Sequence, residues 1–271
     1  MTRRFISAFN KLVFCYKISA DFSTFIKLVR NTKKYKWHSK DPPVKLPDEP
    51  VMYNFRINGQ RRQVFLRTYA GDISIFYEIF LYGAYELPGA IFANATNTVD
   101  AGAHIGLASL FFQSLSPGMR LFSIEPDVEN FSILQKNLKE MIESGKVIPI
   151  QAALDNMDGS LHITKSQFSY NTKVDSGPDG EKVIAISLNS LSALYEIKSI
   201  DILKIDIEGF EQKIFSKNVE WLDRVKNIIL ETHSGADYDA CSKVLLEKGF
   251  QIKKLIPGNS DAENIYWACR Y

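Results

Sequence analysis

The sequence is poor in the features that build disulfide-rich or membrane-spanning proteins. Its 271 residues include only three cysteines, Cys15, Cys241 and Cys269, which are far apart and lack metal-binding spacing. A disulfide framework or a zinc site is therefore not expected. No apolar run approaches the roughly 20 residues that span a bilayer, and charged residues interrupt the N-terminal segment, which also argues against a secretory signal peptide. These absences predict a cytoplasmic globular protein.

Positive charge is concentrated at the N-terminus. Residues 1–46 carry eleven Lys and Arg residues against two Asp, a net charge of +9, whereas the remainder carries −7. Aromatic residues, among them Phe9, Phe22 and Trp37, lie between these charges. We predict a helical arm that either packs on the main domain as two short helices or contacts an anionic membrane surface or an acidic substrate. Nucleic acid is not expected as a partner.

A proline-rich stretch separates this arm from the main domain. Residues 41–50, DPPVKLPDEP, contain four prolines, which disfavour a helix, so the boundary is placed after residue 46 and the domain at 47–271. The segments VMYNFRI and RRQVFLRT then flank Asn58-Gly59, a pair suited to a tight turn, which predicts a β-hairpin. Asp72 is expected to cap a helix over 73–83.

From residue 97 onward, strand and helix patterns alternate, which predicts a parallel sheet with helices on both faces. The expected strands are 97–102, 120–125, 147–154, 199–206, 225–233, 251–256 and 264–271. Helices are expected over 105–115, from Asp127 as N-cap to about 142, and over 238–248. The polar segment 165–181 is either disordered or a lid over a ligand.

Two strand ends indicate a nucleoside-containing ligand, because ligands of such sheets bind at the carboxyl ends of the strands. The first strand leads into VDAGAHIGLAS, where Gly102 and Gly106 allow a tight turn at a helix N-terminus. The second strand ends in Glu125, 23 residues after Gly102. An acidic residue at about this spacing binds ribose hydroxyls in such folds.

The carboxylate of Asp100 beside this turn favours S-adenosylmethionine over a dinucleotide as the ligand. A dinucleotide fold uses G-x-G-x-x-G to hold a pyrophosphate, whereas this turn lacks the third glycine and carries the carboxylate of Asp100. That carboxylate would repel pyrophosphate but attract a ligand ammonium, directly or through water, while the helix N-terminus accepts a ligand carboxylate. S-adenosylmethionine has both groups, and a nicotinamide-dependent oxidoreductase is the less favoured alternative.

Four segments in combination resemble the FkbM-type methyltransferases. They are VDAGAHIGLAS, FSIEPDVENFSILQKNL, QAALDNMDGS and DILKIDIEGFE, and the resemblance covers roughly residues 70–235. It implies a Rossmann-like class I methyltransferase fold of seven mainly parallel strands that binds S-adenosylmethionine and usually methylates an oxygen. The implied acceptor is a hydroxyl on a glycan, a lipid-linked saccharide or a small molecule. His104 stands where the family more often has Asn.

The resemblance also implies a cofactor site. The loop from Asp100 to Gly106 would surround the methionine part, Glu125 with Pro126 would bind the ribose, and Gln151 with Ala152 would contact the adenine edge. Tyr85 and Glu86 either close over the cofactor or are ordinary surface residues. The loop residues concerned are Asp100, Ala101, Gly102, Ala103, His104 and Gly106.

The acceptor is expected at the ends of the fourth and fifth strands. By strand alternation Lys204, Asp206 and Glu208 point to one side of the fourth strand. Glu231 and His233 share one face of the neighbouring fifth strand by the same rule, so five ionisable groups are expected to converge on one small region. His233 is the preferred general base, with Glu231 or Asp206 orienting it, because a pKa near 6.5 suits proton abstraction. Asp206 and Glu208 could instead hold the acceptor. A divalent cation held by Asp206, Glu208, Glu231 and His233 is a rival interpretation, and no metal is assigned.

A function of a different kind stays open at this point. The chain could be a non-catalytic scaffold that keeps the Rossmann-like fold and docks on a membrane or polyanion through residues 1–46.

Overall fold

The computed structural model of the protein describes residues 2–38, 48–164, 173–175, 180–255 and 264–270. The proline-rich linker and the polar segment 165–181 fall largely outside these residues. None of the described helices is both long and apolar enough to cross a membrane.

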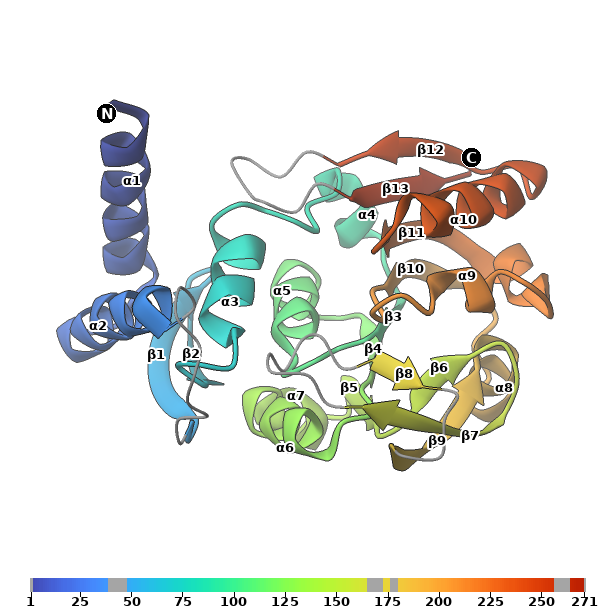
Figure 1. The fold of residues 1–271 in the computed structure, drawn as a ribbon, viewed down its shortest axis with the longest axis horizontal. Coiled ribbons are helices and arrows are strands. Elements are labelled where there is room, and N and C mark those ends of the chain that lie inside the picture. The colour runs from blue at the N-terminus through green and yellow to red at the C-terminus, as the bar shows by residue number, and fades with distance from the viewer. Residues whose placement is uncertain (1, 39–47, 165–172, 176–179, 256–263, 271) are drawn as a thin grey trace.

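A seven-stranded sheet with helices on both faces forms the centre of the molecule (Figure 1). Its strand order is β12-β13-β11-β10-β3-β4-β5. Five neighbouring strands run parallel, and β13 is antiparallel to both β11 and β12. The strands are β3 (Asn97–Ala101), β4 (Arg120–Ile124), β5 (Val147–Ile150), β10 (Ile200–Ile205), β11 (Val225–Glu231), β12 (Gln251–Lys254) and β13 (Ile265–Cys269). The predicted Rossmann-like class I methyltransferase fold is confirmed.

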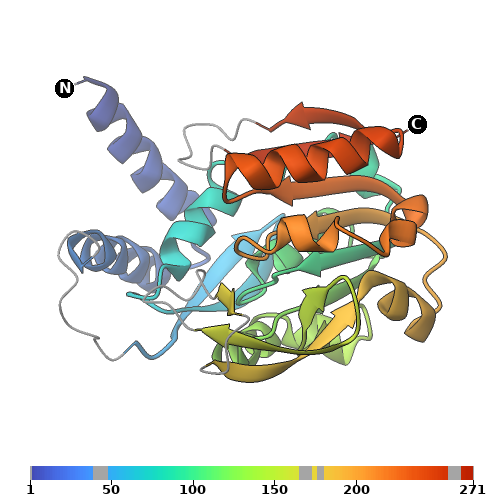
Figure 2. The ribbon, with the colours of Figure 1, turned by 45° about the vertical axis from the view of Figure 1, so that its right-hand side comes forward.

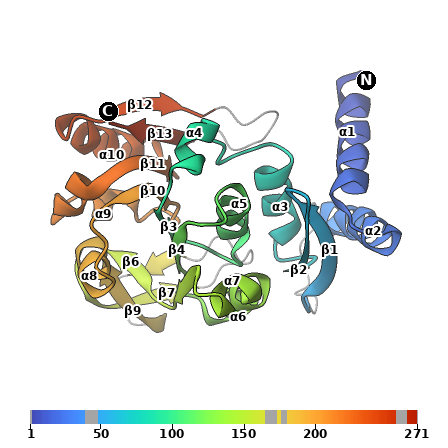
Figure 3. The ribbon, with the colours of Figure 1, turned by 180° about the vertical axis from the view of Figure 1, so that it is seen from behind.

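Two separate cores, one on each face of the sheet, bury most side chains of the central strands. All six residues of β10 are buried, because helices cover both faces of the sheet (Figures 1 and 3). One core joins the sheet to α3 (Asp72–Phe80), α4 (Gly89–Ala93), α5 (Leu107–Leu115), α6 (Val128–Asn137) and α7 (Lys139–Glu143). The other joins it to α8 (Leu188–Leu194), α9 (Glu211–Ile214), the 3-10 helix η1 (Val219–Arg224) and α10 (Gly235–Glu247).

The basic arm packs against a hairpin at one side of the molecule (Figures 1 and 2). The hairpin consists of β1 (Val51–Ile57) and β2 (Gln60–Leu66), and both turn residues, Asn58 and Gly59, have positive φ as predicted. The arm consists of α1 (Thr2–Ile18) and α2 (Phe22–His38). Cys15 of α1 and Leu28 of α2 are buried in the same core as the hairpin residue Tyr53. The arm is therefore anchored to the domain by apolar packing.

Three helix predictions need correction. The helix after the hairpin begins at Asp72, and its N-cap is Gly71, with φ of 97° and no side-chain cap. Asp72 does not cap this helix, because its carboxylate accepts hydrogen bonds from the backbone and guanidinium of Arg67 instead. The helix expected to run to residue 142 is interrupted at Leu138, which is fully buried and separates α6 from α7. The last helix begins at Gly235, with Ser234 as its N-cap.

The single strand predicted over 147–154 is wrong. The structure has β5, which ends at Ile150, and then β6 (Ala153–Asp155), which belongs to a second sheet. Pro149 fits β5 because this is an edge strand, where a missing N–H is tolerated. The second sheet has the order β6-β9-β7-β8, with β7 (Gly159–Thr164), β8 (Lys173–Asp175) and β9 (Glu181–Ser187).

Candidate active site

A cavity of about 290 Å³ lies at the carboxyl ends of the central strands. Its walls come from the segments after β3, β4, β10 and β11, from α3, and from the second sheet through Ala153, Leu154 and Ile163. Five carboxylates line it, namely Glu78, Glu125, Asp206, Glu208 and Glu231. Three basic side chains, His104, Lys204 and His233, also line it. Carboxyl groups therefore outnumber basic side chains in the cavity wall.

The turn after β3 brings its backbone against the end of β10. Gly102 has φ of 76°, and a Cβ atom built on it would lie 1.7 Å from the carbonyl oxygen of Asp206. Only glycine permits both the left-handed backbone and this close approach. Ala103 and His104 follow Gly102 along the cavity wall, whereas Gly106 lies behind them as the N-cap of α5.

Glu125, which directly follows β4, is held in place by backbone N–H groups. Its carboxylate accepts hydrogen bonds from the N–H of His104 at 2.8 Å and from the N–H of Asp127 at 3.0 Å. Burial raises the pKa of Glu125 to about 7 despite these bonds. The side chain is only 5% exposed and lines the cavity together with Pro126. It is thus a preformed hydrogen-bond acceptor at the position predicted for a ribose.

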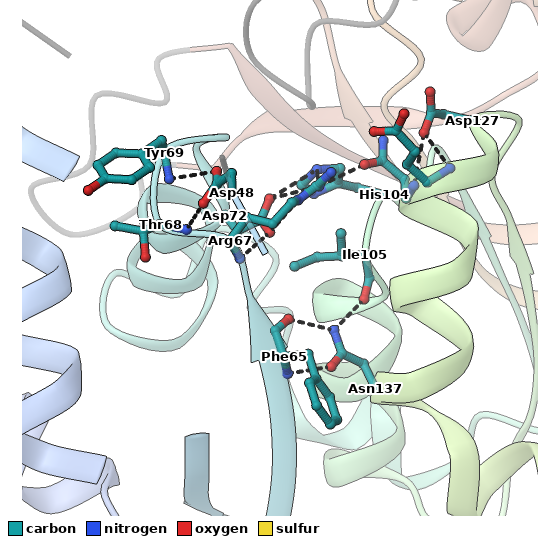
Figure 4. A network of polar contacts seen from close by, with 12 residues as sticks. Asp48, Phe65, Arg67, Thr68, Tyr69, Asp72, His104, Ile105, Asp127 and Asn137 are labelled. Carbon is teal, nitrogen blue, oxygen red and sulfur yellow. Dashed lines mark hydrogen bonds and ion pairs between the residues drawn. The ribbon is translucent and has the colours of Figure 1, made fainter. Parts of the chain in front are cut away.

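His104 ties the glycine turn to the hairpin (Figure 4). Its φ of 49° is left-handed, and its Nε2 atom lies 3.5 Å from Asp72 and 3.4 Å from Arg67. Arg67 also donates to the side-chain oxygen of Asn130 on α6 at 2.7 Å. Burial and the charge of Arg67 lower the pKa of His104 to about 4, against the attraction of Asp72. The imidazole is therefore neutral at physiological pH.

Asn137 makes a second link between the same elements. Its side chain donates to the carbonyl oxygens of Phe65 and Ile105 and accepts from the N–H of Phe65 (Figure 4). This amide joins β2, the glycine turn and α6. The two links together fix the backbone of the turn that faces the cavity.

Lys204 is the centre of a buried ion cluster beneath the turn. Its Nζ atom donates to the carbonyl oxygen of Gly102 at 2.7 Å and lies 3.2 Å from Asp100 and 3.3 Å from Asp206. Burial acts to lower the pKa of Lys204, but Asp100, Asp206 and Glu231 outweigh it and raise that pKa on balance. Asp100 is wholly buried and also accepts from Ser109 at 2.6 Å. The lysine is therefore charged and compensates carboxylates that the fold has buried.

Three carboxylates surround His233. Glu211 contacts its Nδ1 atom at 3.0 Å, while Glu208 and Asp206 lie 3.4 and 3.7 Å from its Nε2 atom. Burial acts to lower the pKa of His233, but these carboxylates raise it to about 11. The imidazole is protonated at neutral pH in this arrangement. Asp206, Glu208 and His233 also present ligand atoms within 4.8 Å of one another, a spacing that could hold a metal ion.

Tyr85 closes the acidic side of the cavity. Its hydroxyl lies 3.0 Å from Glu231 and 3.2 Å from Asp206. Burial raises the pKa of Tyr85, and burial together with Asp206 and Glu78 raises the pKa of Glu231 well above its ordinary value. Glu231 is thus a carboxylate with enhanced proton affinity that faces the cavity.

The structure brings together most of the residues predicted for the site. The residues that line the cavity as expected are Gly102, Ala103, His104, Glu125, Pro126, Tyr85, Lys204, Asp206, Glu208, Glu231 and His233. Others of the predicted set do not line it, namely Asp100, Ala101, Gly106, Gln151, Ala152 and Glu86. Asp100 is turned toward Lys204 and Ser109. Gln151 and Glu86 are exposed.

Sequence reasoning missed the residues that orient the site. Glu211, wholly buried, contacts His233. Arg67 and Asp72 contact His104, and Asn130 in turn accepts a hydrogen bond from Arg67. Glu211 was within reach of sequence analysis as the last acidic residue of DIEGFE, three positions after Glu208. Arg67 and Asp72 carry no such signal, because they reach the turn only through tertiary packing.

The strand order and the site at the carboxyl ends of the strands define a Rossmann-like class I methyltransferase fold. A family model described as the methyltransferase FkbM domain matches residues 100–255, more than half of the chain. The chain therefore belongs to the FkbM methyltransferase domain family.

Individual relatives agree with this assignment. The chain is 27% identical over 149 residues to the hexuronic acid methyltransferase AglP of Haloferax volcanii, covering 55% of this chain and 60% of that protein. It is 27% identical over 203 residues to Methyltransferase 1 of Beauveria bassiana, covering 66% of this chain and 80% of the other. The crystal structure of an FkbM methyltransferase from Methylobacillus flagellatus shares the fold at a TM-score of 0.50 and 15% identity, covering 73% of this chain and 53% of that one.

Proposed function

We propose that the protein transfers a methyl group from S-adenosylmethionine to a hydroxyl oxygen. The observation that carries this proposal is the cavity itself, which combines the glycine turn, Glu125 and an excess of carboxylates. A sulfonium cation is attracted by such a surface, whereas the pyrophosphate of a dinucleotide is repelled. Membership of the FkbM family supports the same activity.

The cavity divides into two parts on this proposal. Gly102, Ala103 and His104 would contact the methionine part of the cofactor, and Glu125 would accept hydrogen bonds from the ribose hydroxyls. Ala153 and Leu154 of the second sheet line the cavity next to the predicted Gln151 and Ala152, and we propose that these two apolar side chains would contact the adenine edge. The cofactor would supply an electrophilic methyl group next to the acidic cluster.

The acceptor hydroxyl would lie among Tyr85, Asp206 and Glu231. Transfer forms an O–C bond and breaks the S–CH₃ bond, whose electron pair stays on sulfur, and the hydroxyl proton moves to a base. We infer that Glu231 takes this proton, because its pKa is raised while it faces the cavity. His233 is protonated and would act as a positioning residue that holds Asp206 and Glu208.

A sugar hydroxyl is the acceptor that these groups fit best. Asp206, Glu208 and Glu231 offer carboxylate oxygens that accept hydrogen bonds from several neighbouring hydroxyls. The relative named as a hexuronic acid methyltransferase supports the same class of substrate. We therefore propose a glycan, free or lipid-linked, ahead of other small molecules.

Calorimetry with S-adenosylhomocysteine tests the cofactor assignment. Saturable binding is expected, and Glu125→Gln should weaken it by about 1–3 kcal/mol, because the amide offers one acceptor oxygen where the carboxylate offers two. Glu143→Gln is the matched control, since Glu143 is exposed on α7 far from the cavity lining. Absence of binding at millimolar ligand would refute the cofactor, and unchanged affinity of the Glu125 variant would refute its role.

Metal-assisted transfer is a second candidate, favoured by the spacing of Asp206, Glu208 and His233. A divalent cation there would polarise the acceptor oxygen and displace the proton from His233. Exhaustive dialysis against a chelator separates the candidates. Full activity after dialysis excludes the metal. Loss of activity that Mg²⁺ or Mn²⁺ restores would support metal-assisted activation of the acceptor in place of proton transfer to Glu231.

A further inference from the structure

The outer faces of α1 and α2 expose an unusual amount of apolar surface. Twelve large hydrophobic side chains are exposed in the described residues, and half of them lie in the short stretch between residues 9 and 37. They are Phe9, Leu12, Tyr16, Phe22, Ile26 and Trp37, with exposed fractions from 45% to 83%. We call these six residues the arm face.

The arm face consists of two rows of side chains, one on each helix. Phe9, Leu12 and Tyr16 follow each other at helical spacing on α1, and Phe22, Ile26 and Trp37 do so on α2. Phe25 joins the two rows, because its ring centroid lies 5.9 Å from that of Tyr16 and 5.9 Å from that of Phe22. The rows therefore meet at the turn between the helices.

Basic residues accompany the arm face and acidic ones do not. Lys17, Arg30, Lys33 and Lys34 are exposed on the same two helices. The one acidic residue within 2–38 is Asp21, whose carboxylate is already engaged by Thr24, Asn54 and Arg61. Aromatic and aliphatic side chains interleaved with Lys and Arg are typical of helices that lie in the interface of an anionic bilayer.

We propose that the arm face binds an anionic lipid surface. A polyanion such as a nucleic acid would be held by the basic residues but would leave Leu12 and Ile26 in water. A second copy of the chain would bring two arms together, each within a segment of net charge +9, and this repulsion opposes self-association through the arm face. A lipid interface accommodates both the apolar and the basic side chains.

The inner sides of α1 and α2 pack on the domain, so membrane binding through the arm face would also orient the domain. Cys15 and Leu28 are buried in the core with Tyr53, and Lys27 donates from Nζ to the carbonyl oxygen of Met52 at 2.6 Å. The arm is thus fixed to the hairpin, which in turn is linked through Arg67 to the glycine turn of the cavity. Docking through the arm face would hold the domain at the membrane in one orientation.

Vesicle co-sedimentation of the full chain tests the proposal independently of the methyltransferase activity. Binding is expected to vesicles of equal parts phosphatidylcholine and phosphatidylserine, to weaken as salt is added, and to be lost with phosphatidylcholine alone. Phe22→Ser with Trp37→Ser should weaken binding by roughly tenfold or more. The matched control is Ile184→Ser with Leu246→Ser, two residues that are similarly exposed on other elements.

Trp37 provides a direct readout because it is 83% exposed, whereas Trp221 is buried and Trp267 is half-buried in the main sheet. Its fluorescence should shift to shorter wavelength on anionic vesicles, and Trp37→Phe should remove the shift while vesicle binding persists. Equal vesicle binding by the arm-face and control variants would overturn the proposal. Heparin binding that is unchanged by the apolar substitutions would also overturn it. A dimer in solution that the Phe22→Ser, Trp37→Ser variant abolishes would do the same. Unchanged melting temperatures of the variants exclude misfolding as the cause.

Discussion

Replacing Lys204 by Met should destabilise the protein far more than the loss of one surface charge would. The Lys204 ammonium contacts Asp100 at 3.2 Å, Asp206 at 3.3 Å and the carbonyl oxygen of Gly102 at 2.7 Å, and Asp100 has no exposed surface. Methionine fills the same space but leaves Asp100 charged and buried with only Ser109 as donor. Removing one partner of a buried pair costs about 3–5 kcal/mol, so we expect a loss of that size in the free energy of unfolding.

Urea denaturation near neutral pH measures this loss through the transition midpoint at an unchanged slope. Lys139→Met is the control, because Lys139 is 72% exposed and its ion pair with Glu143 is worth about 0.5 kcal/mol or less. Adding Asp100→Asn to Lys204→Met should recover more than half of the loss, since it removes the uncompensated charge. A Lys204→Met protein within about 1 kcal/mol of the parent, or a double variant less stable than the single one, would refute this reasoning.

Three further predictions concern the cavity wall. Gly102→Ala should cost about 2–4 kcal/mol and abolish S-adenosylhomocysteine binding, because its Cβ would meet the carbonyl oxygen of Asp206 at 1.7 Å; Gly118→Ala, with nothing within 4 Å, is the neutral control in thermal melting and calorimetry. The folded-state pKa of His104 is lowered to about 4 from 6.5, so stability is lost as pH falls from 6.5 to 4, and His104→Asn should flatten that decline in denaturation curves measured across this range. In steady-state assays Glu231→Gln should lower kcat by about 100-fold or more. His233→Asn should keep a kcat that rises with pH through the raised pKa of Glu231. A larger loss of kcat in His233→Asn than in Glu231→Gln would return the base role to His233.

The sheet could be predicted because its central strands are buried on both faces. All six residues of β10 are buried and four of them are apolar, and β11 contains the buried apolar run Ile228–Leu230. The segment 147–154 reads in the same way, yet the chain leaves the sheet after Ile150. Its alternative partner is β9, some 30 residues further on, so the break depends on a long-range pairing that local sequence does not encode.

The candidate site was predictable where side chains stand at strand ends. Glu125 and Asp206 directly follow their strands and Glu231 ends its own, so topology alone brings them together. Orientation was not predictable in the same way. The direction of Asp100 depends on Lys204 and Ser109, and the protonation of His233 depends on three carboxylates that converge only in the folded chain.

The second sheet gives the cavity one wall that does not belong to the main sheet. Ala153 and Leu154 of β6 and Ile163 of β7 face the glycine turn across the cavity, and β6 is connected to β5 by only two residues. A molecule that fills this space would contact residues of both sheets at once. Because Gln151 and Ala152 are the whole connection from β5 to β6, a ligand in the cavity would add a second, noncovalent contact between the two sheets.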